Sequence, residues 1–447
     1  MDMAWPICSA KWPRKTAEVL VSAITWLVFL VLDFLDAVLC VFFRIADEYF
    51  EGNNTKECYC HGREAKGTSV MSDERESVVS ETLCGRKNLF REMGFLGFPR
   101  KLEGLSETYG EGKGVVGRRR WSDCGCESCV SWMSNVDQRL HVIVKEPSKA
   151  TFGYGCSERP TENVILLHGF LSSSSLWTEM VFPYLSKSAY QNYRLFAVDL
   201  LGFGRSPKPR DCLYTLRDHL EMIEESVIGP NELGSFHLVS HSMGSVIALA
   251  LAAKYSKSVK SITLVAPPYF PSPRGDASLT ALGRLAEKKI WPPLSFGSAV
   301  MSWYEHLSRC VCFLTCRNHR AWEWILKLLA RKRDLHFLVM DLARHTHHSA
   351  WHNMHNVLCG GAKSMDDYLD TLNGSGAKVH IMHGARDQLV PPECSYSIKM
   401  KVPRAQLNIL PDADHITVML DREKHFTRDL ERIWASASGT GIGGHGT

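Results

Sequence analysis

The chain opens on an apolar run, passes through a polar stretch, and then settles into alternating strand and helix patterns. Residues 19–43 are almost unbroken apolar sequence, interrupted by Asp33 and Asp36. From 51 to about 138, Gly, Ser, Glu and Lys dominate and hydrophobic periodicity is poor. From residue 140 onward, short apolar runs alternate with amphipathic helical patterns. This alternation predicts a mainly parallel sheet with helices on both faces.

Individual elements follow from the same pattern. Strands are expected at 164–167, 195–198, 236–239, 379–382 and 407–410, and helices at 214–228 and 246–253. Between 267 and about 370 the alternation stops and helical patterns dominate, for example at 321–329. We therefore divide the chain into residues 1–50 (signal peptide or signal anchor), 51–139 (a Cys-containing, largely flexible spacer), 140–434 (the α/β domain, with a cap at about 267–370) and 435–447 (a Gly-rich disordered tail).

The N-terminal segment predicts export. Lys11, Arg14 and Lys15 precede the apolar run, which resembles a secretory signal in its first half and is long enough to span a bilayer as a whole. Basic residues before such a segment stay on the cytoplasmic side, which places the α/β domain on the other side. Whether the segment is cleaved or retained is open. Glycosylation triplets begin at Asn53 and Asn373, and Cys40 could carry a lipid.

Composition narrows the function classes. Hydrophobic residues are 45% and charged residues 22%, an ordinary globular balance, and a net charge of +4 gives no support to nucleic-acid binding. The 15 cysteines favour disulfides if the chain is exported. Cys126-x-x-Cys129 supplies half of a zinc site, but no second CxxC or HxxxH pair follows it closely in sequence. We therefore predict no metal and no cofactor.

The central motif is a strand, a tight turn and a helix. The strand at 236–239 runs into Ser240-His241-Ser242-Met243-Gly244, and a helix follows. This is the context of a nucleophile elbow, which holds a serine in a strained conformation between small neighbours. Gly244 meets that requirement, and Ser240 is small but replaces the usual glycine.

A serine nucleophile needs a base that is held by a carboxylate. Asp387 follows the strand at 379–382, and His415 follows the strand at 407–410. The order serine, acid, histidine is that of the α/β-hydrolase fold, so we predict a catalytic triad of Ser242, Asp387 and His415. Asp414 is adjacent to His415 in sequence and is poorly placed to hold it. Asp199 precedes the nucleophile and is interpreted as a residue that orders a loop.

Two backbone N–H groups should form the oxyanion hole. One is that of Met243, at the start of the helix after the elbow, and the other is that of Phe170, in the loop after the first predicted parallel strand. His168 and His241 are interpreted mainly as structural residues that fix loops near the site.

The predicted cleft is lined from that loop and from the cap. The residues assigned to it are His168, Gly169, His348, Trp351 and His352. His348 and His352 stand one helical turn apart and could share a metal. No acidic ligand lies nearby in sequence, so a place along the substrate cleft is preferred for both.

Several further segments are distinctive. They are Trp121-Ser122-Asp123-Cys124-Gly125-Cys126, Val164-Ile165-Leu166-Leu167-His168-Gly169-Phe170-Leu171-Ser172-Ser173-Ser174, Val198-Asp199-Leu200-Leu201-Gly202, Ser302-Trp303-Tyr304-Glu305-His306 and Pro391-Pro392-Glu393-Cys394-Ser395-Tyr396. Together these segments resemble the plant BODYGUARD family. The resemblance runs from the N-terminal apolar segment to about residue 434. It implies a lysophospholipase-like protein of the cell wall or the outer face of the plasma membrane, associated with cuticle formation, with the triad on Ser242, Asp387 and His415.

The expected function is therefore a serine hydrolase or acyltransferase that acts on lipid carboxylic esters through an acyl-Ser242 intermediate. Lysophospholipids and cutin or suberin precursors are the candidate substrates that the resemblance implies. Hydrolysis and acyl transfer share this intermediate and differ in whether water or an alcohol attacks it. The alternative is a ligand receptor that keeps the fold with vestigial catalysis, and a third possibility is an inactive scaffold.

Overall fold

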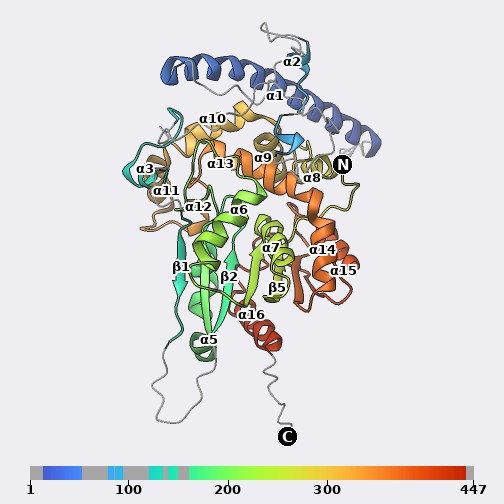
Figure 1. The fold of residues 1–447 in the computed structure, drawn as a ribbon. Helices are drawn as coiled ribbons and strands as arrows, with labels where there is room; N and C mark the ends of the chain where they lie inside the picture. Colours follow the sequence, from blue (N-terminus) through green and yellow to red (C-terminus); the bar gives the residue numbers. More distant parts are fainter. Residues whose placement is uncertain are drawn as a thin grey trace, which may run out of the picture.

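A seven-stranded sheet forms the centre of the protein (Figure 1). The computed structural model describes residues 14–52, 79–84, 86–93, 120–133, 139–148 and 161–438. The strand order is β1-β3-β2-β4-β5-β6-β7. β1 pairs antiparallel with β3, and the other neighbours are parallel. The strands are β1 (Val142–Lys145), β2 (Glu162–Leu167), β3 (Tyr193–Val198), β4 (Phe236–His241), β5 (Val259–Val265), β6 (Lys378–Gly384) and β7 (Gln406–Leu410). The predicted mainly parallel sheet is confirmed.

Helices cover both faces of the sheet, as the continuous apolar strands require. One face packs against α6 (Leu216–Ile223), the π-helical η4 (Glu224–Ile228), α7 (Met243–Lys254), α14 (Met365–Gly374) and α15 (Glu393–Lys401). The other packs against α4 (Ser175–Met180), η3 (Phe182–Tyr184), α5 (Lys187–Asn192) and α16 (Glu423–Ala437). α7, which follows the elbow, is apolar all round and buried over residues 243–252.

The insert between β5 and β6 is helical, as predicted. Its elements are α8 (Ala277–Leu285), α9 (Pro293–Trp303), α10 (Glu305–Thr315), α11 (His319–Ala330), α12 (Phe337–Asp341), α13 (His347–His352), the π-helical η5 (Asn353–Cys359) and η6 (Gly360–Ser364), followed by α14. Figure 1 shows α9, α10 and α13 between the sheet and the N-terminal helix.

The N-terminal apolar run forms a single helix, α1 (Arg14–Glu51), which lies across the cap (Figure 1). By length and composition, Glu18–Glu51 could cross a membrane, and 28% of its most apolar window is buried in the protein. Asp36, which interrupts the apolar run, accepts hydrogen bonds from the backbone N–H groups of His306 and Leu307 at the start of α10. This carboxylate therefore caps a helix of the cap domain.

Short pieces of the 51–139 stretch also pack against this region. They are η1 (Glu81–Leu83), α2 (Leu89–Glu92) and α3 (Glu127–Met133). The backbone N–H of Ser80 donates to the Asn356 side chain, and the Trp121 indole donates to Asp47 of α1. Cys58, Cys60 and the triplet beginning at Asn53 lie outside the described residues. α16 continues to Ala437, three residues past the predicted domain end.

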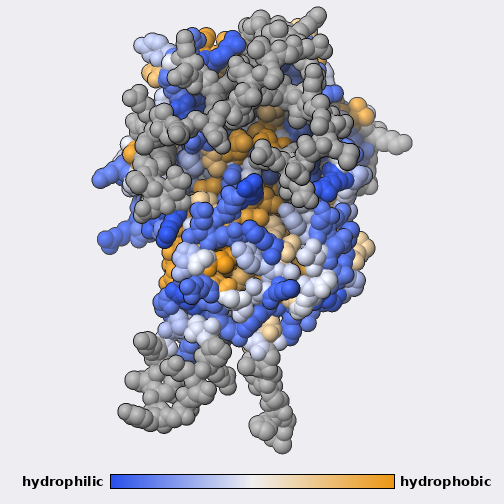
Figure 2. Space-filling view, viewed as in Figure 1, coloured by the Kyte–Doolittle hydropathy of each residue, from blue (hydrophilic) through white to orange (hydrophobic). Residues whose placement is uncertain are grey.

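The exposed apolar side chains are concentrated on the cap side of the molecule. On α1, Trp26 is 66% exposed and Ile45 60%, and on α11 Trp324 is 66% exposed and Leu329 74%. In Figure 2, by contrast, hydrophilic residues cover most of the lower half of the visible face, and apolar residues gather toward its middle.

Candidate active site

Ser242 occupies a strained turn between β4 and α7. Its φ is 50° and its ψ is −120°, a backbone conformation that is costly for a residue with a side chain. The Ser242 N–H donates to Val265 O of the next strand at 2.8 Å, and α7 begins one residue later, at Met243. Strain of this kind persists only where the surroundings fix it, and it holds the serine at the top of the sheet.

The small neighbours predicted for the elbow have a steric reason. A Cβ on Gly244 would lie 2.5 Å from His168 O and 2.7 Å from Leu167 O, so α7 approaches β2 as closely as only glycine allows. Ser240 is fully buried, and its hydroxyl lies 3.2 Å from Ser245 Oγ and 3.3 Å from Thr263 O. The serine that replaces the usual glycine is thus accommodated with hydrogen-bond partners.

His415 and Asp387 form a hydrogen-bonded pair. His415 Nδ1–H donates to Asp387 Oδ2 at 2.6 Å, and Asp387 Oδ1 accepts from the N–H groups of Leu389 and Val390 at 2.9 Å each. Burial acts to raise the pKa of Asp387, but hydrogen bonds from His383 and His415 outweigh it and hold the pKa below its usual range. The carboxylate therefore stays charged, and its hydrogen bond to Nδ1 orients the His415 ring.

Close contacts bring the loops after four strands together. A Cβ on Gly384 would lie 2.4 Å from Ala413 O, which packs the end of β6 against the loop that carries His415. His241 Nε2–H donates to His415 O at 3.0 Å. A Cβ on Gly169 would lie 3.1 Å from Ser242 Cβ, so the loop after β2 lies directly against the serine. Asp387, His415 and Ser242 thus stand at the same carboxyl edge of the sheet.

The predicted oxyanion donors flank Ser242. Met243 is the first residue of α7, so its N–H has no partner within the helix. Phe170 follows Gly169 in the loop that contacts Ser242, and its ring packs against Phe203 at 5.7 Å between centroids. The start of α7 thus lies against the loop after β2, and an oxyanion hole between them stays a prediction.

His168 is buried and hydrogen-bonds to two loops. Its Nδ1–H donates to Gly169 O at 2.7 Å, and its Nε2 accepts from Leu200 N–H at 2.9 Å. Burial lowers the pKa of His168, which agrees with a neutral ring. The neutral imidazole ties the loop after β2 to the loop after β3.

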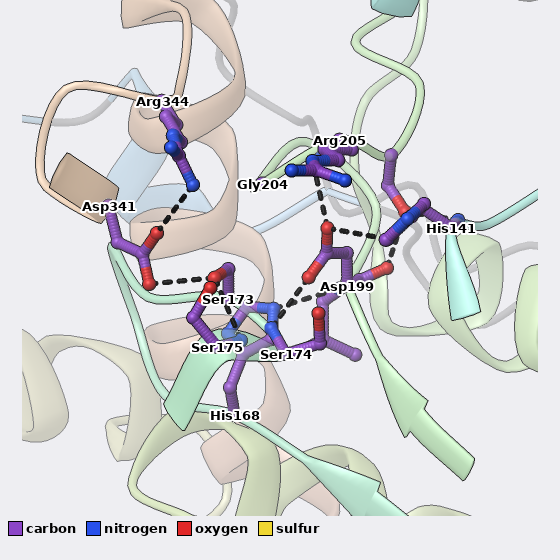
Figure 3. A network of polar contacts seen from close by, with 12 residues as sticks. His141, His168, Ser173, Ser174, Ser175, Asp199, Gly204, Arg205, Asp341 and Arg344 are labelled. Carbon is purple, nitrogen blue, oxygen red and sulfur yellow. Dashed lines mark hydrogen bonds and ion pairs between the residues drawn. The ribbon is translucent and has the colours of Figure 1, made fainter. Parts of the chain in front are cut away.

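Asp199 orders the loops beside His168 (Figure 3). Its two oxygens accept from Ser174 N–H at 2.6 Å and Arg205 N–H at 2.8 Å, and His141 Nδ1 lies 3.1 Å away. Asp414, the other carboxylate set aside in sequence, accepts from Ile416 N–H at 2.9 Å within its own turn. The contacts of Asp199 agree with its interpretation as a loop-ordering residue, and those of Asp414 lie within its own turn.

Asp341 joins the cap to the loop after β2, and no sequence motif predicted this contact. Ser173 Oγ–H donates to Asp341 Oδ2 at 2.7 Å, and Arg344 lies 3.3 Å from Oδ1 (Figure 3). Asp341 is 2% exposed, and burial raises its pKa to about 6. The contact between α12 and Ser173 links the position of the cap to the loop that carries Phe170.

The three cap residues assigned to the cleft are deeply buried. His348 Nε2 donates to Cys212 O at 3.0 Å and His352 Nδ1 to Leu213 O at 3.1 Å. Trp351 is 3% exposed and stacks under the Arg86 guanidinium, 4.1 Å from its ring centroid. These contacts hold the cap on the 212–213 segment, and a role for the three residues in a cleft stays a prediction.

The structure also brings cysteines together with histidines that are distant in sequence. Cys124, Cys126 and Cys129 lie beside His319 of α11, and a second trio of Cys312, Cys316 and His345 lies in the cap. No metal site was predicted because no second ligand pair follows Cys129 closely in sequence. His319 comes 190 residues later than Cys129, and no spacing rule links the two.

Comparison with known proteins shows a family and several relatives that this chain resembles. The family described as "alpha/beta hydrolase fold" matches residues 162–421. "Probable lysophospholipase BODYGUARD 4" from Arabidopsis thaliana is 51% identical over 95% of this chain and 99% of its own length. BODYGUARD 5 and BODYGUARD 1, also named probable lysophospholipases and from the same plant, are 46% and 40% identical over 96% and 91% of this chain, and over 98% and 94% of their own lengths.

Proposed function

This chain belongs to the BODYGUARD family of α/β hydrolases and is a carboxylic-ester hydrolase, and from that premise we propose that it cleaves or transfers the acyl group of lipid esters through an acyl-Ser242 intermediate. The observation that carries the proposal is the position of the strained Ser242 elbow beside the His415–Asp387 pair.

In the proposed mechanism, His415 Nε2 accepts the Ser242 proton as Oγ attacks the ester carbonyl. The same proton then passes to the leaving alcohol, and the acyl group stays on Ser242. Asp387 keeps the proton of His415 on Nδ1 through the 2.6 Å hydrogen bond, and it stabilises the imidazolium that forms. Water, or a second alcohol, then releases the acyl group with His415 as the base.

The negative charge on the carbonyl oxygen would be met by the N–H groups of Met243 and Phe170. The N-terminus of the 12-residue α7 adds the positive end of its dipole at the same point. Removal of one such donor costs about 2.7–4 kcal/mol of transition-state stabilisation in a well-studied hydrolase.

A lipid substrate is supported by the surface of the cap and of α1. The exposed side chains of Trp26, Ile45, Trp324 and Leu329 are suited to contact with lipid rather than water. The names of the relatives indicate lysophospholipids as one substrate class. We propose that α1 rests its exposed face on a membrane while its other face binds the cap.

Export to the outer face of the plasma membrane or the cell wall, with α1 retained, completes the proposal. Cleavage of α1 would remove Asp36 from the start of α10 and Asp47 from Arg309, whose side chain is 6% exposed. N-terminal sequencing of the protein isolated from plant membranes tests this point. A mature chain that begins beyond residue 51 would contradict retention.

The decisive experiment uses the full chain in mixed micelles. Fatty-acid release from 1-acyl-lysophosphatidylcholine and from long-chain monoacylglycerol is compared for the parent, Ser242→Ala, Asp387→Asn and the surface control Ser188→Ala. We expect a loss on the order of 10⁴–10⁶-fold for the first two variants, as in other serine hydrolases. Ser188 lies exposed on α5, and its variant should match the parent.

A serine-reactive fluorophosphonate distinguishes the alternative receptor role. An enzyme is labelled at Ser242 and turns over at least one ester. If folded parent protein releases no fatty acid and Ser242 stays unlabelled, the enzyme proposal fails and a ligand receptor is favoured.

A cuticle role requires chemistry on polyester precursors. The parent is given a monoacylglycerol of a hydroxy fatty acid, and free acid and acyl-transfer products are separated by mass spectrometry. Ester-linked dimers that are absent with Ser242→Ala would support acyl transfer in cutin or suberin formation. Free acid alone would restrict the enzyme to hydrolysis.

A further inference from the structure

Four side chains with metal-binding atoms meet at a point remote in sequence from the catalytic motifs. The thiols of Cys124, Cys126 and Cys129 and the imidazole of His319 have their ligand atoms within 4.8 Å of one another. His319 Nε2 lies 3.4 Å from Cys126 Sγ and 3.3 Å from Cys129 Sγ. None of the three cysteines is in a disulfide.

Local structure explains why the three thiols converge. Cys124 and Cys126 lie in the turn that follows Trp121, and the N–H of Cys126 points at Cys124 Sγ at 3.4 Å. Cys129 is the third residue of α3, which starts at Glu127, and its side chain returns to the same side. His319 is the first residue of α11 and closes the group from the cap.

The dimensions fit tetrahedral zinc. Zn–S bonds of about 2.3 Å and Zn–N bonds of about 2.0–2.1 Å place S and N ligands about 3.6 Å apart and two sulfurs about 3.8 Å apart. The 3.3 Å and 3.4 Å separations at His319 are close to that value, and the 4.8 Å limit leaves only small side-chain movements to make. Three thiolates and one imidazole are a ligand set typical of structural zinc sites.

Charges around the cluster are consistent with a metal thiolate centre. Zn²⁺ with three thiolates carries one net negative charge. Lys208, 8% exposed, borders the same small cavity as Cys124 and Cys129 and supplies a positive charge beside them.

We propose that Cys124, Cys126, Cys129 and His319 bind one structural zinc ion that fastens the segment 120–133 to the cap. The cavity beside the site is also lined by Arg344, His345 and Thr346, which begin three residues after the end of α12. α12 carries Asp341, the partner of Ser173 in the loop after β2. The zinc thereby fixes the side of the cap that contacts the oxyanion loop.

The first test measures metal in the full chain, purified in a thiol reductant without chelator and dialysed against trace zinc. Elemental analysis should give about one zinc per chain. X-ray absorption should show three sulfur ligands and one nitrogen ligand at zinc. These two measurements on the parent protein decide the proposal even if every ligand variant fails to fold.

Ligand variants locate the ion. Cys126→Ser and His319→Ala should each lose the zinc, and Cys310→Ser, a partly exposed cysteine of α10 outside the cluster, should retain it. Cobalt in place of zinc should give thiolate charge-transfer absorption in Cys310→Ser and not in Cys126→Ser. Circular dichroism establishes which variants are folded.

Three results would overturn the assignment. One is a parent chain that binds no zinc under these conditions. Another is a native disulfide among Cys124, Cys126 and Cys129 found by mass spectrometry of non-reduced peptides. The third is zinc that persists in Cys126→Ser but leaves Cys316→Ser, which would assign the ion to the second trio of Cys312, Cys316 and His345.

Discussion

At the scale of single residues, the elbow works because two backbones touch where a side chain would normally separate them. α7 can begin immediately after Ser242 only if nothing projects from Gly244 toward His168 O and Leu167 O. The same contact positions the loop after β2 beside the serine. Both the packing of α7 on β2 and the position of Ser242 therefore depend on the absence of a side chain at Gly244.

Gly244→Ala should both destabilise the protein and impair catalysis. Its Cβ would lie 2.5 Å from His168 O, and relief requires α7 or β2 to move. We expect a loss of about 1–3 kcal/mol in the free energy of unfolding, as for other overpacked sites, and reduced kcat. Thermal melts and ester hydrolysis measure the two effects.

Gly283→Ala is the matched control for this variant. Gly283 lies within α8, and a Cβ there meets nothing within 4 Å. Helix propensity predicts a gain of up to about 1 kcal/mol. Equal melting temperatures for Gly244→Ala and Gly283→Ala would contradict the steric account.

Asp341→Asn should change how stability depends on pH. The folded protein holds the Asp341 proton up to a pKa of about 6, whereas the unfolded chain releases it near 3.8. The parent therefore loses stability as pH rises through this window, because the unfolded state binds fewer protons. Two pKa units correspond to at most about 3 kcal/mol.

Asparagine cannot ionise, so Asp341→Asn should gain stability relative to the parent between pH 4 and pH 7. Its amide oxygen can still accept from Ser173 Oγ–H. Denaturant melts at the two pH values test this. A difference between variant and parent that is the same at both would show that Asp341 does not titrate in the window.

The positions of the three proposed triad residues could be predicted from sequence because each stands a few residues beyond a strand in the chain. Ser242, Asp387 and His415 inherit their positions from strands that any parallel sheet brings to one edge. Asp341 and His319 could not be found in this way. Their partners are 168 and 190 residues away, and neither belongs to a local motif.

At the scale of elements, α1 is bound to the cap by the buried carboxylate of Asp36 and the partly buried carboxylate of Asp47. Asp47 pairs with Arg309, with Nη1 at 2.7 Å and Nη2 at 2.6 Å, and also accepts from the Trp121 indole. Asp33 and Asp36, the two acidic residues within the apolar run, belong to the same helix, and Asp36 is 1% exposed. Such groups are found where a helix has a polar partner.

Asp47→Ala should destabilise the cap. It leaves the Arg309 guanidinium, 6% exposed, without its carboxylate, and loss of one partner of a buried ion pair costs about 3–5 kcal/mol. Glu48→Ala, at an exposed position one residue along, should stay within about 0.5 kcal/mol of the parent. Differential scanning calorimetry of the full chain compares them, and equal melting temperatures would contradict the pairing.

The pattern of hydrophobic residues predicted most elements and missed the ones that depend on distant partners. β2, β3, β6 and β7 could be placed because each is a short apolar run between turns. β1 is only partly buried and has a weaker apolar pattern. The docking of α1 on α10 could not be predicted, since an apolar helix is expected equally in a signal, a membrane or a core.

At the scale of the whole molecule, the hydrolase domain and the residues before it form one structure. Contacts run from α1 to α10, from Ser80 to Asn356 and from Trp121 to Asp47. The cap therefore depends on sequence that precedes the sheet by more than a hundred residues. A domain boundary near residue 139 would cut through these packing contacts.

A chain that starts at residue 139 should be far less stable than the full chain. It would expose the surfaces of the cap that α1 and the 79–133 segments cover, including buried Arg309 and Glu305. We expect aggregation or a markedly lower melting temperature, measured by size-exclusion chromatography and thermal melts in detergent. A monomeric fragment that melts with the full chain would show that the N-terminal segments contribute no stability.

The docking of α1 also sets an order in time. Asp36 meets the backbone of His306, 270 residues later in the chain. At about 5–20 residues per second, a ribosome that has made α1 needs roughly 14–54 s more to make α10. Throughout that interval the helical cap that covers one face of α1 has not been synthesised. The apolar face of α1 must therefore first be covered by lipid or by a chaperone. During synthesis, α1 therefore contacts other molecules before it contacts the cap of its own chain.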